Sequence, residues 1–292
     1  MEIETQRKAL GALKISLSTA MGLALIKFFV GWLTQSMAII ASALDSLMDA
    51  GSSLVNLLAV REASKPPDEE HTYGHGKIEA LAGLIQSLFV TVSGLFVISE
   101  SVKRLIVGST VKTIPVGIGV MLVSMLASYL IVWVIQRASR EVRSLVLAAE
   151  RLHYATDILT NGGVILALVL VQTTRFAVWD LLVSIAVSIY IFKSSFGILR
   201  SSIDELLDKS LPQTAVMEIE HLIRSHHPSI IGLHNFRSRR VGEKIFLDFH
   251  IEIRGEDDFK SAHLMTEGLI AQIKHAYPHS DVTVHYDPEG AV

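Results

Sequence analysis

Two pairs of ionisable residues, each pair spaced four apart, lie inside stretches that are otherwise apolar enough to cross a lipid bilayer. The pairs are Asp45 with Asp49 and His153 with Asp157. An ionisable side chain at the centre of a membrane helix costs roughly 2.5 to 3.5 kcal/mol on insertion scales, so one that is kept there usually serves a function. Three carboxylates and one imidazole offer suitable ligands for a divalent cation. The alternative for a single buried aspartate is an ordinary hydrogen-bonding residue of a helix bundle. For His153 alone, the alternative is a histidine at the membrane interface.

The composition indicates a polytopic membrane protein. Half of the 292 residues are hydrophobic, the mean hydropathy is +0.44 and only 19% of the residues are charged, which is too apolar for a soluble chain of this size. The net charge of -3 gives no electrostatic case for nucleic acid as a partner. With no cysteine in the chain, disulfides and thiolate ligands are excluded, and a transition metal must be bound by His, Asp or Glu.

Six segments before residue 201 are long and apolar enough to span a bilayer. They run over residues 9–31, 37–60, 79–103, 113–136, 144–171 and 176–198. Lys14 and Lys27 interrupt the first, and no small-residue cleavage site is evident, so we interpret it as a retained span rather than a signal peptide. Basic residues gather at the amino terminus, in the 61–78 loop and over 137–151, so the positive-inside rule places both termini in the cytoplasm.

Helix geometry predicts the depth of the two pairs. If the second span starts at Met37 on the outer side, Asp45 and Asp49 lie roughly 12 and 18 Å into the bilayer. If the fifth starts near Ser144 on the inner side, His153 and Asp157 lie roughly 13 and 20 Å from that side. In a core about 30 Å thick, both pairs bracket the midplane. Since residues four apart share a helix face, two facing helices supply a four-coordinate, tetrahedral site that suits Zn²⁺.

A second group of candidate ligands lies in the loop after the second predicted span. Pro66 and Pro67 end that helix, and Asp68, His71 and His75 follow within PPDEEHTYGHGK. The four-residue spacing of the two histidines is that of two ligands on one helical turn. The alternative is a solvated turn with incidental histidines.

After Arg200 the sequence becomes polar and suits a small soluble domain. Residues 243–253 and 281–287 alternate apolar with polar side chains and predict half-buried strands; 231–241 is a further candidate strand, and 212–226 and 258–277 have helical patterns. The order helix, strand, strand, helix, strand suggests a compact α+β layer. His250, His285 and Asp287 lie on polar strand faces, where His234 and His263 could join them. These residues form a further metal site, or they are ordinary polar residues of the domain surface.

Taken together, the motifs resemble a known family. The DxxxD pair at Asp45, the loop HTYGHGKIEAL from His71 to Leu81 and the HxxxD pair at His153 are similar to those of the cation diffusion facilitators, in particular the bacterial zinc/proton antiporters among them. The resemblance covers essentially the whole chain. It implies a homodimer with a six-span transmembrane domain over residues 1–207 and a ferredoxin-like cytoplasmic domain over residues 208–292, in a bacterial inner membrane.

The resemblance also implies a role for each group of residues. The quartet Asp45, Asp49, His153 and Asp157 corresponds to the transport site, and Asp68, His71 and His75 to a second zinc site in the loop. In the cytoplasmic domain a zinc pair would be held by His234, His250, His263, His285 and Asp287. Lys77 and Asp208 match positions that form a charge interlock between the two domains.

These features predict a transporter rather than an enzyme. Because the ligands must lose protons to bind metal, we expect exchange of Zn²⁺ for protons by alternating access. An intramembrane metalloprotease needs a motif such as HExxH, which the chain lacks. A membrane-anchored metal sensor would not need ligands at the midplane of two helices. An exporter of Fe²⁺, Cd²⁺ or Mn²⁺ with the same fold is the nearest alternative.

Overall fold

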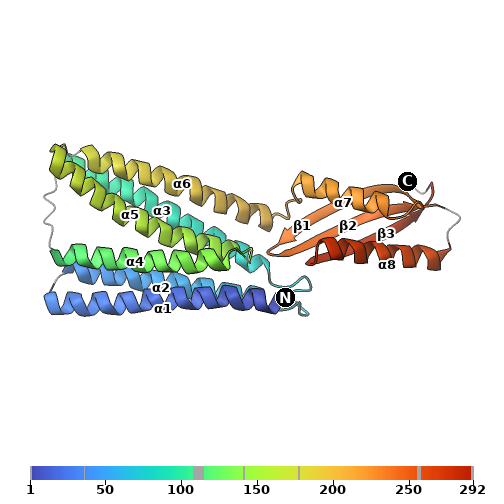
Figure 1. The fold of residues 1–292 in the computed structure, drawn as a ribbon, viewed down its shortest axis with the longest axis horizontal. Helices are drawn as coiled ribbons and strands as arrows, with labels where there is room; N and C mark the ends of the chain where they lie inside the picture. The colour runs from blue at the N-terminus through green and yellow to red at the C-terminus, as the bar shows by residue number, and fades with distance from the viewer. Residues whose placement is uncertain are drawn as a thin grey trace. The chain divides into compact units, whose positions relative to one another are not determined.

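The computed structural model describes residues 2–35, 37–107, 115–140, 142–176, 178–254 and 258–290. The chain forms two compact units, Met1–Ile203 and Asp204–Val292. Six long helices account for the first unit, with the last of them running three residues beyond it (Figure 1). They are α1 (Glu2–Thr34), α2 (Met37–Ala63), α3 (Lys77–Val107), α4 (Pro115–Ala138), α5 (Leu145–Thr174) and α6 (Val178–Leu206).

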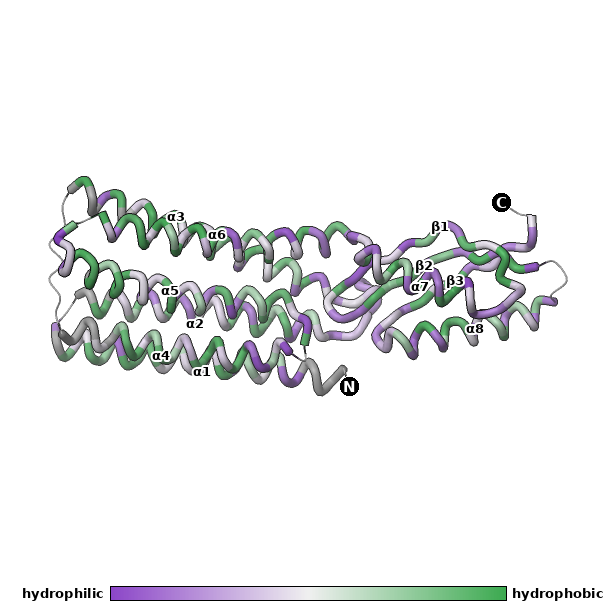
Figure 2. The backbone as a smooth tube through the Cα atoms, turned by 45° about the horizontal axis from the view of Figure 1, so that its top comes forward, coloured by the Kyte–Doolittle hydropathy of each residue, from purple (hydrophilic) through white to green (hydrophobic). Residues whose placement is uncertain are grey.

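The long helices correspond to the six predicted spans, although the first two residues of the predicted 113–136 span and residue 177 of the predicted 176–198 span lie outside the described residues. Within the described part of the chain, α1, α3, α4, α5 and α6 each contain a window long and apolar enough to cross a membrane. Figure 2 shows the long hydrophobic stretches of these helices. Helix α2 is not among them, because Asp45, Asp49 and several serines interrupt its apolar sequence. Its membrane crossing stays a prediction.

Small residues let the first two helices pack closely. Ala20, Ala24 and Gly31 of α1 lie on its buried face, spaced as one helical stripe. A Cβ added at Gly31 would lie 2.8 Å from Ile40 Cγ1 and 3.0 Å from Ile40 N of α2, so only glycine allows this approach. Many large apolar side chains on the outside of the bundle are exposed, which suits a helix surface in contact with lipid.

Helix α5 is held at its start by a polar contact. The hydroxyl of Ser144 is the N-cap: it accepts a hydrogen bond from Leu147 N at 3.3 Å and donates one to Glu79 Oε2 of α3 at 2.5 Å. Satisfying the free backbone donors at this end stabilises the helix two turns before His153.

The second unit has the predicted order of helix, strand, strand, helix, strand. Its elements are α7 (Gln213–His226), β1 (Ile230–Val241), β2 (Lys244–Ile253), α8 (Phe259–Ala276) and β3 (Ser280–Pro288). The sheet order is β1-β2-β3, with β1 antiparallel and β3 parallel to β2. The alternation predicted for 243–253 is confirmed: Ile245, Leu247, Phe249, Ile251 and Ile253 are buried and pack with both helices.

Candidate metal centres

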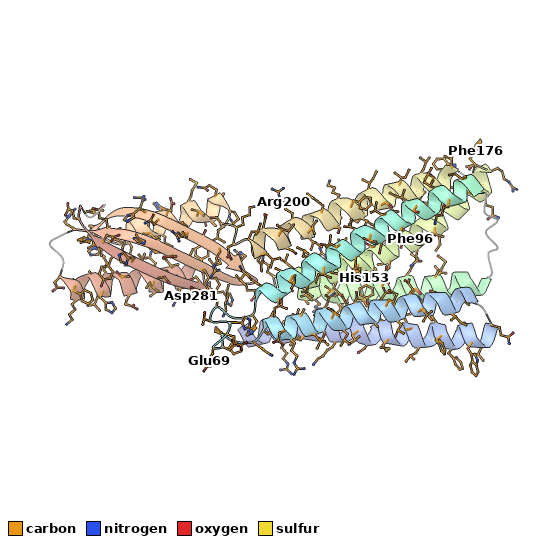
Figure 3. The ribbon with its side chains drawn as sticks, turned by 180° about the vertical axis from the view of Figure 1, so that it is seen from behind. Glu69, Phe96, His153, Phe176, Arg200 and Asp281 are labelled. Atoms are coloured by element: carbon orange, nitrogen blue, oxygen red, sulfur yellow. The ribbon has the colours of Figure 1, made fainter. Side chains whose placement is uncertain are left out.

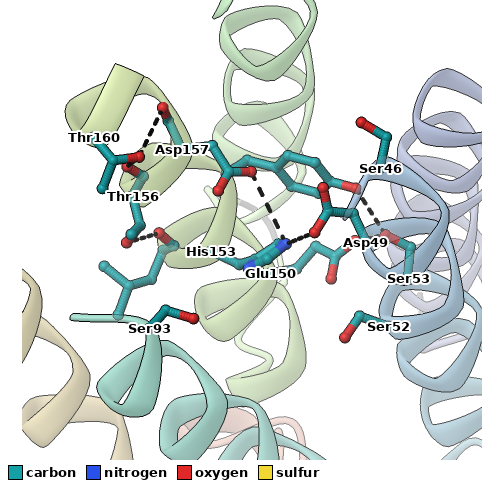
Figure 4. A network of polar contacts seen from close by, with 12 residues as sticks. Ser46, Asp49, Ser52, Ser53, Ser93, Glu150, His153, Thr156, Asp157 and Thr160 are labelled. Carbon is teal, nitrogen blue, oxygen red and sulfur yellow. Dashed lines mark hydrogen bonds and ion pairs between the residues drawn. The ribbon is translucent and has the colours of Figure 1, made fainter. Parts of the chain in front are cut away.

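Three of the four predicted midplane ligands converge between α2 and α5. His153 Nε2 lies 3.0 Å from Asp49 Oδ1 and 4.0 Å from Asp157 Oδ2, and one ligand atom from each residue lies within 4.8 Å of the others. All three side chains are partly buried, at 19% exposed for His153, 22% for Asp49 and 30% for Asp157. Figure 4 shows the imidazole between the two carboxylates.

The spacing of these ligand atoms fits a small divalent cation. For ligands about 2.1 Å from a tetrahedral Zn²⁺, neighbouring ligand atoms are roughly 3.4 Å apart. The two measured separations, 3.0 and 4.0 Å, lie on either side of that value. The spacing of His153 to each carboxylate is therefore compatible with three ligand bonds to one zinc ion.

Asp45, the fourth predicted ligand, is one turn from Asp49 on α2 but is not part of the three-residue group. Its side chain is exposed, yet it is close enough to interact electrostatically with Asp49, His153 and Lys27. Its role as a ligand stays a prediction.

One turn from His153, a carboxylate that the sequence reasoning missed links three helices. Glu150 of α5 is completely buried. Its Oε1 accepts hydrogen bonds from Ser16 of α1 at 2.7 Å and Ser53 of α2 at 2.5 Å, and its Oε2 accepts one from Asn56 of α2 at 2.5 Å. Ser53 also contacts the Tyr154 hydroxyl at 3.0 Å. The network joins the helices that carry Asp49 and His153.

A buried lysine also lies close to the cluster. Lys27 of α1 is 7% exposed, and its ammonium donates a hydrogen bond to the buried hydroxyl of Ser46 at 2.7 Å. In the sequence, both Lys27 and Glu150 are charges inside apolar stretches, but neither has the four-residue pairing that predicted the metal ligands. Spacing alone therefore could not reveal their partners.

The loop residues also form a compact group. His71 Nδ1 lies 3.4 Å from Asp68 Oδ1, and His75 Nε2 lies 3.3 Å from Asp68 Oδ2. Backbone hydrogen bonding from His71 holds the pKa of Asp68 below its usual range. His75 is buried, and its Nδ1 has no hydrogen-bond partner within the described part of the chain. An aspartate and two imidazoles that face one another fit a zinc ion.

The predicted helical turn for these two histidines is wrong. His71 and His75 lie in an irregular segment before α3, which begins only at Lys77. Gly74 has a φ of +83°, a left-handed conformation that interrupts a helix, and its N–H donates to the carbonyl of His71 at 2.8 Å. The chain turns back on itself, and this turn brings the two rings to within 4.5 Å between centroids. In Figure 3 the label Glu69 marks this loop, and the label His153 marks the cluster within the helix bundle.

In the second unit, register brings three histidines side by side across the sheet. His234 of β1 pairs with His250 of β2, which pairs with His285 of β3. Asp287 lies 3.1 Å from the nearest nitrogens of His234 and His250 and 3.2 Å from that of His285. Burial acts to raise the pKa of Asp287, but the hydrogen bond with His250 and the charges of the histidines hold it below its usual range. Three imidazoles around an ionised carboxylate fit zinc.

His263 is not brought into this group. It lies on α8, where its exposed side chain is parallel to the ring of Phe259 at 6.5 Å. Ala262, Leu269 and Ile273 of the same helix pack against Phe249 and Ile251, and the neighbouring His250 points to the other face of the sheet. A role for His263 as a ligand stays a prediction. So does the Lys77 to Asp208 interlock, although Asp208 contacts Arg239 within its own unit at 3.2 Å.

Comparison with known proteins identifies both parts of the chain. Residues 13–207 match the family model of the cation efflux transmembrane domain, and residues 211–289 match that of the cation efflux protein cytoplasmic domain. Relatives include the cation-efflux pump FieF of Salmonella arizonae, 37% identical over 276 residues, which covers 93% of this chain and 90% of the relative. FieF of Yersinia pestis is 35% identical over 266 residues, covering 91% and 88%.

A solved structure, the metal-bound C-terminal domain of the CzcD transporter from Thermotoga maritima, is 29% identical. The match covers 28% of this chain and 99% of that domain, with a TM-score of 0.26.

A bundle of long apolar helices with a partly buried cluster of carboxylates and an imidazole is the architecture of an integral membrane metal-cation transporter. The matches to both domain models are more specific, because together they cover most of the chain. The chain belongs to the cation diffusion facilitator family, and its function is efflux of divalent metal cations.

Proposed function

We propose that this protein exports Zn²⁺ in exchange for protons by alternating access, with Asp45, Asp49, His153 and Asp157 as the transport site. The observation that carries the proposal is the convergence of Asp49, His153 and Asp157 from two helices of the bundle. Asp45 would complete the site after a small movement of α2, since it already interacts electrostatically with the other members.

Proton exchange follows from the chemistry of these ligands. A histidine binds metal only through a neutral nitrogen, and an aspartate binds it as a carboxylate, so metal and protons compete for the same atoms. Metal arriving from the cytoplasm binds while the site faces inward. After the bundle opens outward, protons reach the carboxylates and the imidazole, weaken metal binding and accompany the return.

Proton import offsets only part of the cost that the membrane potential imposes on zinc export. Moving two positive charges outward against 100 mV costs about 4.6 kcal/mol, whereas importing one proton for each ion leaves about 2.3 kcal/mol to oppose. The pH gradient would supply the remainder.

The donor set favours zinc among the candidate metals. His153 is the one nitrogen ligand among three carboxylates, and imidazole suits Zn²⁺ better than Mn²⁺. An exporter of Fe²⁺, Cd²⁺ or Mn²⁺ remains the alternative function. Transport of labelled zinc in the presence of each competing cation distinguishes these metals.

The remaining proposals concern assembly and placement in the membrane. We place all six long helices across a bacterial inner membrane with both termini in the cytoplasm, because basic residues gather at the ends of the helices on that side. The match to the family's cytoplasmic domain supports a ferredoxin-like, cytoplasmic second unit and a homodimer. Resident zinc would be held by Asp68, His71 and His75 in the loop and by His234, His250, His285 and Asp287 in the second unit, where it would offset negative charge and rigidify each group.

The transport site is tested with purified protein in liposomes that carry an imposed proton gradient. We expect zinc uptake by the wild type and none by Asp49→Ala. The matched control is Asp180→Ala, which removes an aspartate from the first turn of α6 and is expected to transport normally. Undiminished uptake by Asp49→Ala would refute the proposal.

We further propose that zinc in the second unit biases the protein towards a transport-competent state, as a ligand that binds one state more tightly must do. The transport rate of His250→Ala should then lose part of its dependence on cytoplasmic zinc. An unaltered zinc dependence would show that the cluster has no such role.

A further inference from the structure

Lys27 is a buried lysine of the helix bundle, and its side chain does not extend to the membrane surface. It lies seven residues before the end of α1, roughly 10 Å along the helix. A lysine near a helix end usually extends its ammonium to the interface. Here the ammonium is instead buried and hydrogen-bonded to Ser46 of the neighbouring helix.

The position of Lys27 on its helix explains this burial. It shares the stripe of α1 that also presents Ala20, Ala24 and Gly31, and the close approach at Gly31 brings α2 against that stripe. Ser46, the hydrogen-bond partner, immediately follows Asp45 in α2. Lys27 is thus directed towards the helix that carries half of the transport site.

The carboxylates that interact electrostatically with Lys27 are Asp49, Asp45 and Asp157. These are the three carboxylates of the proposed transport site. A buried charge needs compensation by opposite charge, and the hydroxyl of Ser46 supplies only a dipole. The carboxylates therefore compensate Lys27, and Lys27 compensates part of their charge.

We propose that Lys27 is the resident cation of the metal-free site, a positioning residue that competes electrostatically with the transported metal. Its positive charge reduces the mutual repulsion of the carboxylates while no metal is bound. When a divalent ion arrives, the same charge repels it, so the site binds metal more weakly and releases it more readily. This inference rests on the proposed transport function and adds a residue from α1 to a site otherwise built from α2 and α5.

The test compares variants of the full-length protein in two assays. Equilibrium zinc binding is measured by competition with a fluorescent chelator, and the binding that Asp49→Ala abolishes is assigned to the membrane cluster. Zinc transport is measured in proteoliposomes as a function of zinc concentration. We expect Lys27→Met to bind zinc at this cluster at least about tenfold more tightly, because repulsion of a divalent ion is removed. Its maximal transport rate should fall severalfold, because release becomes slower.

Two variants separate this role from a purely structural one. Lys27→Arg keeps the charge and should remain close to the wild type in both assays. Lys14→Met removes the other lysine that interrupts α1, whose side chain is exposed, and should leave both unchanged. If Lys27→Met is not recovered folded, Lys27→Gln, which keeps a donor on a side chain one atom shorter, provides the same comparison.

Unchanged or weaker zinc binding by the folded neutral variant would overturn the role of Lys27. A structural role alone predicts weaker binding and slower transport together, rather than tighter binding with slower transport. Failure of the transport function itself has a different signature, since Asp49→Ala would then transport zinc as well as the wild type.

Discussion

The hydrogen-bond network of Glu150 predicts a measurable energetic coupling between α2 and α5. Replacing Glu150 with methionine keeps much of the side-chain length but removes the acceptor of three hydrogen bonds. The hydroxyls of Ser16, Ser53 and Tyr154 can pair with one another, since Ser53 already lies 3.3 Å from Ser16 and 3.0 Å from Tyr154. The amide of Asn56 is left as a buried donor without its acceptor, which costs about 1–3 kcal/mol.

Adding Asn56→Ala to Glu150→Met should recover much of that cost, because the orphaned amide is removed. Hydrogen bonds to charged groups contribute about 1.5–3 kcal/mol, whereas coupling energies measured between membrane helices average about 0.6 and reach about 1.7. We therefore expect a coupling of about 1–1.7 kcal/mol between the two positions, with the double variant more stable than the sum of the single effects predicts.

The assay is a double-mutant cycle of equilibrium unfolding in mixed detergent micelles. Thr173, near the far end of α5, bonds only to nearby backbone carbonyls in the described structure, so Asn56→Ala with Thr173→Ala serves as the control pair. That pair should be additive to within about 0.3–0.5 kcal/mol. A coupling between Asn56 and Glu150 no larger than this would refute the idea that the network links the two ligand-bearing helices.

Three further predictions concern selectivity, packing and pH. His153→Asp should lower the ratio of zinc to manganese transport severalfold, because it removes the nitrogen ligand; an unchanged ratio measured in proteoliposomes would contradict this. Gly31→Val should destabilise the bundle by about 1–3 kcal/mol in detergent unfolding, because the new side chain overlaps Ile40. Asp258 is the N-cap of α8, and the hydrogen bond that its carboxylate accepts from the backbone of Ser261 lowers the pKa of Asp258. This cap therefore stabilises α8 fully above the ordinary aspartate pKa, and the stabilisation is lost as the pH falls through the lowered value. The protection of the Ser261 amide from hydrogen exchange, relative to its intrinsic rate at each pH, should fall over that range in the wild type and much less in Asp258→Asn, whose amide oxygen remains an acceptor.

The elements were largely predictable because each has a strong local signal. Apolar length predicted the long helices, and strict alternation predicted which face of β2 is buried. The four-residue pairs located Asp49, His153 and Asp157 because helix geometry alone places such residues on one face. The prediction failed where the same spacing lies outside a helix: His71 and His75 meet through a glycine turn, whose left-handed residue a helical pattern cannot anticipate.

Contacts between helices were the part that local patterns could not supply. Lys27 and Glu150 are isolated charges in sequence, and their partners lie on other helices, 19 residues from Lys27 and 94 to 134 residues from Glu150. The four-residue spacing identified candidate ligands but gave no account of the charges that surround them.

Lys27 and Glu150 have different roles around the proposed metal ligands. Glu150 is surrounded by hydrogen-bond donors, so its charge is satisfied locally and it fixes the relative positions of α2 and α5. Among the described residues, Lys27 has one hydroxyl partner and three carboxylates within electrostatic range, so its charge remains coupled to whatever occupies the site. In the proposed transport cycle, a metal ion that replaces protons at Asp49 and Asp157 would change the environment of Lys27 far more than that of Glu150. For this reason neutralising Lys27 should alter metal affinity and turnover in opposite directions, while replacing Glu150 should first alter the stability of the bundle.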